Sequence, residues 1–174
     1  MDGRSELFIV VMAVFVALLF STTGYYLWRA RKASTGGWEC LIGRLRPVDR
    51  DNIAAIASDH DFSIDPTRIS AMIGGMEGLG TLESNCVVLI DLACYVQRWY
   101  PEALAVAEEL RLNAREIQWH VGRLKATASD QSLQANFPDY AHGAVSIYFA
   151  MTRMLLKLYE RGNLPGLVDL QQAI

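Results

Sequence analysis

The amino-acid sequence predicts an all-α protein, with a single N-terminal transmembrane helix followed by a compact bundle of five or six helices. Two observations predict this fold. Residues 7–28 contain no charged side chain, and the remainder shows apolar residues at helical spacing without a pair of strand-like segments. The chain therefore divides into a short extracytoplasmic N-terminus (1–6), the transmembrane helix, a basic flank with a flexible linker (29–37) and a helical domain (38–174).

The apolar stretch over residues 7–28 is long enough to cross a bilayer. Its 22 residues rise about 33 Å as a helix at about 1.5 Å per residue, against a hydrocarbon thickness of about 30 Å. Inside lipid the backbone must satisfy its own hydrogen bonds, so an isolated span has to be helical. Tyr25, Tyr26 and Trp28 lie at its end, where interfacial aromatic residues are expected.

The basic residues around the span predict its orientation. One of them, Arg4, precedes the span, and five follow it up to residue 46: Arg29, Arg31, Lys32, Arg44 and Arg46. Because lysine and arginine near a span favour the cytoplasmic side, we expect a single-pass protein of the cell membrane. Its N-terminus should be outside and its C-terminal domain in the cytoplasm.

A cleavable signal peptide is the main alternative for this stretch. Such a peptide needs a net positive N-terminal region, whereas Asp2 and Glu6 here outnumber Arg4. The small-residue cleavage pattern is also poor, because Ser-Thr-Thr-Gly runs directly into Tyr25. An uncleaved signal-anchor is therefore favoured. A buried core helix is a third interpretation, but the unbroken run is long for a small soluble domain.

Composition excludes some classes of partner for the domain. From Trp38 onward the chain has 12 Lys and Arg against 17 Asp and Glu, a net charge of −5. Nucleic acid is therefore not an expected partner, because it requires a basic surface. The three cysteines, Cys40, Cys86 and Cys94, are odd in number and widely spaced. They do not form a disulfide framework, which fits a reducing compartment.

The first half of the domain predicts two short helices and one long one. Aspartates suit the N-caps of helices over 49–59 and 65–73. The glycine-rich stretch 74–80 lacks the lysine of a phosphate-binding loop, so we expect a connection that lets two helices fold back closely. Residues 82–99 are apolar nearly all round and therefore predict a helix in the middle of the bundle, interrupted by Asp91.

The second half predicts a regular helix over 101–126, a polar loop over 127–137 and a helix over 138–161 that ends at Gly162. A short helix over 165–173 follows. The 101–126 helix carries a heptad seam, defined as Ala103, Ala107, Leu110, Ala114, Ile117, Val121 and Leu124. This seam can pack inside the bundle or between chains. The charged residues beside it are Glu108, Glu109, Arg111, Arg115, Glu116 and Arg123, and they are interpreted as a solvated face.

Three residues are candidates for chemistry. Asp91 lies among apolar neighbours, where a carboxylate is costly unless it is paired. We expect a partner from another helix: Arg68, Arg115, Arg123 or His120. An unpaired Asp91 would be available for acid–base chemistry. Glu116 and His120 are four residues apart, a spacing that can supply two metal ligands. No catalytic residue, cofactor or metal is assigned from the sequence.

The sequence thus favours a membrane-anchored interaction or scaffold module over an enzyme. Its expected partners are the lipid bilayer, a second copy of the chain or other membrane proteins. The alternative is a small-molecule or metal-binding bundle with possible enzymatic activity, centred on Asp91 with Glu116 and His120. A sensor that signals across the membrane is least favoured, because only six residues precede the span.

Overall fold

The computed structural model describes residues 11–17, 20, 21, 37–59, 61, 63–127 and 132–174. Its helices in the domain are α2 (Gly37–Ile42), α3 (Arg50–Ser58), α4 (Pro66–Ile73), α5 (Gly75–Val96), α6 (Ala103–Thr127), α7 (Ser132–Arg161) and α8 (Leu167–Ala173). No strand occurs among the described residues, so their fold is all-helical as predicted. The predicted number of helices was too low, because α2 had not been expected.

The described part of the predicted span is helical and exposed. Residues 11–17, 20 and 21 have helical backbone. Their large apolar side chains are 41–73% exposed: Val11, Met12, Val14, Phe15, Val16 and Phe20. The other residues of 7–28, the N-terminal residues 1–6 and the linker before Gly37 lie outside the described residues.

Helix α5 occupies the middle of the bundle, as its apolar sequence predicted. It contacts α2, α4, α6 and α7, and it is the one helix in the described part of the chain that is long and apolar enough to cross a membrane. Its most apolar window is 67% buried inside the bundle. A core helix of a soluble fold meets the same criterion of length and composition.

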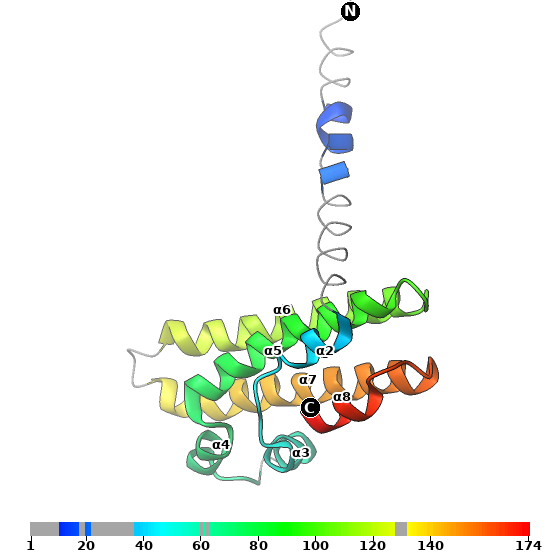
Figure 1. The fold of residues 1–174 in the computed structure, drawn as a ribbon. Coiled ribbons are helices and arrows are strands. Elements are labelled where there is room, and N and C mark those ends of the chain that lie inside the picture. Colours follow the sequence, from blue (N-terminus) through cyan, green and yellow to red (C-terminus); the bar gives the residue numbers. More distant parts are fainter. Residues whose placement is uncertain (1–10, 18–19, 22–36, 60, 62, 128–131) are drawn as a thin grey trace, which may run out of the picture.

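The heptad seam of α6 packs inside the bundle. All seven seam residues are at most 8% exposed, and α6 lies against both α5 and α7. Figure 1 shows α6 and α7 as the two longest rods, with α3 and α4 beneath them. The seam therefore has its partners within the same chain, and self-association through it is not supported.

The glycine-rich stretch 74–80 is not a loop. Gly74 is left-handed, with φ 74°, and ends α4, while α5 begins at the very next residue. A Cβ atom on Gly78 would lie 1.5 Å from the carbonyl oxygen of Ile73, so only glycine permits this approach. The glycines bring two helices together as expected, but they do so from within the first turns of α5.

Helix α7 begins earlier than its proline suggested. It starts at Ser132 and contains Pro138, so the second half of the predicted 127–137 loop is helical. As the seventh residue of the helix, Pro138 has no N–H to bond the carbonyl four residues earlier, so α7 lacks that one intrahelical hydrogen bond. The structure also ends α5 at Val96 and begins α6 at Ala103, slightly inside the predicted bounds.

The end of α7 is formed by Asn163 and not by Gly162. Asn163 is the left-handed residue, with φ 45°. Its N–H donates to the Glu160 carbonyl at 3.2 Å, and the Leu164 N–H donates to the Tyr159 carbonyl at 3.0 Å. This is the hydrogen-bond pattern of a Schellman cap, shifted by one residue from the predicted position.

Helices α2 and α8 close one side of the bundle by contacting each other. Gly166, with φ 83°, is the residue before α8. A Cβ atom there would lie 2.4 Å from the Trp38 ring, so the glycine gives room for the indole. Leu170 is fully buried, which anchors α8 to the core.

Candidate functional site

Asp91 is buried and paired, as expected, but with a cation that the sequence had not suggested. Its carboxylate is 6% exposed in α5 and accepts a hydrogen bond from Arg44 at 3.2 Å. Arg44 lies in the turn after α2, 47 residues earlier in the chain. The carboxylate therefore ties the segment next to the predicted anchor to the central helix.

Asn85 holds the same segment and was missed by the sequence analysis. It is 1% exposed. Its Oδ1 accepts from the Arg46 N–H at 2.9 Å, and its Nδ2 donates to the Arg46 carbonyl at 2.9 Å. The amide also donates to the Tyr148 hydroxyl at 3.3 Å. One side chain thus satisfies both backbone groups of Arg46 in the absence of a strand partner. An asparagine within an otherwise apolar helix was the available signal.

His120 belongs to an aromatic cluster shared by α6 and α7. Its ring centroid lies 5.0 Å from that of Trp119 and 5.8 Å from that of Tyr140. The Trp119 and Tyr140 rings are themselves 5.7 Å apart. The guanidinium carbon of Arg123 stands 5.4 Å from the Trp119 centroid, a distance suited to a cation–π contact.

The imidazole of His120 is held in a partly desolvated position. Its Nδ1 atom is buried and has no hydrogen-bond partner among the described residues. Burial lowers the pKa of His120, and the nearby Glu116 carboxylate offsets part of that effect. Gly143 on α7 makes room for the ring, because a Cβ atom there would lie 2.9 Å from the imidazole Cε1.

The three candidate residues have different surroundings. Asp91 bonds to Arg44 on one side of α5, whereas His120 packs among aromatic rings and Glu116 is exposed one turn earlier. Within the described residues, no group of three or more His, Cys, Asp or Glu side chains is placed to hold a metal ion. The geometry therefore gives no support to a shared metal site at these residues.

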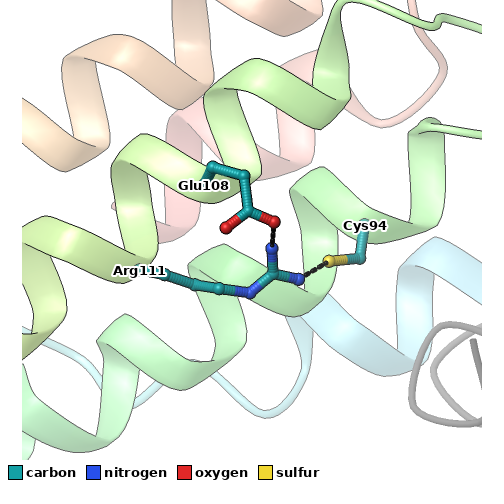
Figure 2. A network of polar contacts seen from close by, with 3 residues as sticks. All are labelled: Cys94, Glu108 and Arg111. Atoms are coloured by element: carbon teal, nitrogen blue, oxygen red, sulfur yellow. Dashed lines mark hydrogen bonds and ion pairs between the residues drawn. The ribbon is translucent and has the colours of Figure 1, made fainter. Parts of the chain in front are cut away.

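A second polar link joins α5 to α6. Figure 2 shows Arg111 of α6 donating to the Cys94 Sγ atom of α5 at 3.0 Å while it pairs with Glu108. Cys94 is 6% exposed and Cys86 2%. Burial raises the pKa of the Cys86 thiol to about 12, so it stays protonated near neutral pH and is a poor nucleophile.

The face of α6 opposite the seam is exposed and partly apolar. We call it the outer face, and it comprises Ala105, Glu108, Leu112, Arg115, Glu116, Trp119, Gly122, Arg123 and Ala126, all exposed. Leu112 is 62% exposed and Trp119 51%. The sequence analysis treated this face as solvated because its charged residues are numerous. Its four apolar members are in fact spaced at intervals of seven: Ala105, Leu112, Trp119 and Ala126.

Two helix glycines should respond oppositely to alanine. Gly143→Ala should lower the free energy of unfolding by about 1–3 kcal/mol, because the new methyl group overpacks the His120 ring. At Gly122 a Cβ atom meets nothing within 4 Å. Gly122→Ala should therefore stabilise the fold by about 0.5–1 kcal/mol, through helix propensity. Chemical unfolding of the full-length chain in detergent, followed by circular dichroism, measures both. Equal effects at the two positions would contradict the described packing.

The lowered pKa of His120 predicts a loss of stability in mild acid. The unfolded chain binds a proton on this histidine at a higher pH than the folded chain does. Stability therefore rises with pH through the window between the folded pKa and about 6.5. Unfolding free energies at pH 5.5 and 7.5 should differ more for the natural chain than for His120→Gln. Identical pH dependence in the two proteins would show that this ring is not desolvated.

Comparison with protein families, with curated proteins and with solved structures finds no match to this chain. Its function is therefore inferred from its own residues. The described geometry offers two features for that inference: an exposed apolar segment near the N-terminus and the outer face of α6.

Proposed function

We propose that this protein is a single-pass membrane-anchored interaction or scaffold module. Its helical domain binds another protein through the outer face of α6. Residues 7–28 form the anchor in this proposal, and the domain lies in the cytoplasm. The main support for this proposal is the row of exposed apolar residues at heptad spacing on α6, in which Leu112 is 62% and Trp119 51% exposed.

The membrane part of the proposal is supported by the exposure of the N-terminal helical residues. Phe20 is 73% exposed and Val11 57%. An uninterrupted apolar helix surface is unfavourable in water and favourable in lipid. Helix α5, the one helix among the described residues that is long and apolar enough to span a membrane, has 67% of its most apolar window buried inside the bundle. The basic residues after the span favour a cytoplasmic domain.

The proposed interaction role is supported by the difference in burial between the two faces of α6. The seam side is buried against the bundle, whereas Leu112 and Trp119 on the outer face remain more than half exposed. Single exposed apolar residues are common on protein surfaces. Here, however, Leu112 and Trp119 are one heptad apart on one stripe, as in helices that pack against a partner.

Cys40 provides a natural probe of membrane topology. It is exposed, whereas Cys86 and Cys94 are buried. A membrane-impermeant maleimide should leave Cys40 unlabelled in intact cells and label it once the membrane is opened. A Ser5→Cys variant in a Cys40→Ser background is the matched control, and it should be labelled from outside. The proposal fails if Cys40 reacts in intact cells, or if an alkaline wash releases the full-length chain from membranes.

A photo-reactive residue at Leu112 tests the docking surface. In native membranes it should form an adduct with protein, because the outer face is covered in this proposal. The control is the same residue at Val168 of α8, which is similarly exposed at 63% but lies on another helix. Protein adducts at both positions alike, or an adduct at Leu112 with lipid alone, would show that α6 is not the docking surface.

A further inference from the structure

We propose that the outer face of α6 binds the outer face of α6 in a second copy of this chain, with the two helices antiparallel. Leu112 of each copy then meets Trp119 of the other. This inference rests on the proposed function, because it names the partner of the same surface. The surface for self-association is therefore the side of α6 opposite the seam, and not the seam itself.

The spacing of the outer face fits a two-fold axis between residues 115 and 116. Such an axis places a residue that lies a given number of positions before it at the same level as the residue that lies equally far after it in the second copy. Leu112 then faces Trp119, and Ala105 faces Ala126, so that large apolar residues meet at the centre and small ones at the ends. An isologous contact of this kind requires a self-complementary patch, and the outer face is one.

The charges of the outer face complement each other in the same arrangement. Glu108 and the neighbouring Glu109 lie in the first half of α6, whereas Arg123 lies near its end. Antiparallel pairing sets these two acids of one copy near Arg123 of the other. At the axis, Arg115 and Glu116 of one copy gather with Arg115 and Glu116 of the other. Parallel pairing would instead set like charges beside each other, which disfavours that orientation.

Gly122 supplies a separate reason to expect a close neighbour. It lies on the exposed face, where a Cβ atom would meet nothing within 4 Å. Glycine in a helix interior costs about 1 kcal/mol relative to alanine, and the isolated bundle makes no use of the space. In the antiparallel pair this position is opposite the segment around Glu108, where a small residue permits close approach of the two backbones.

The anchor compensates for the modest size of this contact. A single helix-on-helix interface falls among small protein interfaces, below about 1,200 Å² of buried surface. Confinement to one membrane raises the effective concentration of the domains, so that a weak contact can still be occupied. The pairing is therefore expected for the full-length chain in a bilayer.

Cysteine crosslinking of the full-length chain in lipid vesicles tests both partner and register. In a Cys40→Ser background, Ala105→Cys and Ala126→Cys chains are prepared separately and mixed. A short bismaleimide should crosslink the mixture to a dimer. Each variant alone should give no crosslinked dimer, because the two copies of either position are 21 residues apart along the helix, about 31 Å. Circular dichroism and alkaline washing first establish that each variant is folded and membrane-embedded.

The outcomes separate this inference from the proposed function. Crosslinking of Ala105→Cys with itself would mean parallel pairing, and no crosslink in the mixture would mean no pairing in this register. Either result overturns the inference. If the photo-adduct at Leu112 nevertheless contains a different protein, the interaction role stands without self-pairing.

A charge reversal at the axis provides a second test of the two-fold arrangement. Arg115→Glu should reduce the yield of the mixed crosslink at least several-fold, because it places acids against Glu116 of the second copy. Arg115→Glu combined with Glu116→Arg restores opposite charges and should restore the yield. Both side chains are exposed, so neither change disturbs the core. A double variant that stays as poor as the single one would contradict the two-fold arrangement.

Discussion

The packing of α6 between α5 and α7 is the constraint on which the rest of the bundle depends. Alanines at 103, 107 and 114 let the neighbouring helices approach, while Leu110 and Ile117 fill the space between them and are fully buried. A helix held on one side by two partners must present its other side outward. Leu112 and Trp119 consequently stay more than half exposed, although Trp119 packs against the Tyr140 ring at its edge.

Two side chains of α5 attach the segment between α2 and α3 to the bundle. Asn85 holds both backbone groups of Arg46, and each such bond contributes about 1 kcal/mol. The pair between Asp91 and Arg44 adds less, because the Arg44 side chain is 48% exposed and water screens it. The polar residues of the core helix therefore act as attachment points for the chain segment that precedes α3. In the alternative hypothesis, Asp91 was the centre of a ligand site.

Much of the helical layout could be predicted, because it follows from local patterns. Asp49 and Asp65 cap α3 and α4 as expected, each accepting from a backbone N–H within the first turn, and the seam of α6 follows directly from its heptad spacing. The features that were predicted wrongly from the sequence depend on tertiary contacts. Gly78 lies inside α5, where the Ile73 carbonyl approaches too closely for any side chain, and Pro138 lies within α7 without starting it. The partner of Asp91 could not be predicted, because spacing within one helix carries no information about a residue 47 positions away.

The contact between Trp38 and Gly166 has a consequence for the order in which the molecule is made. The indole of α2 cannot receive its cover until Gly166 has left the ribosome, by which time the preceding helices are already available to pack. The bonds from α5 to Arg44 and Arg46 can form much earlier in synthesis, so α2 is attached to the bundle well before its indole is covered.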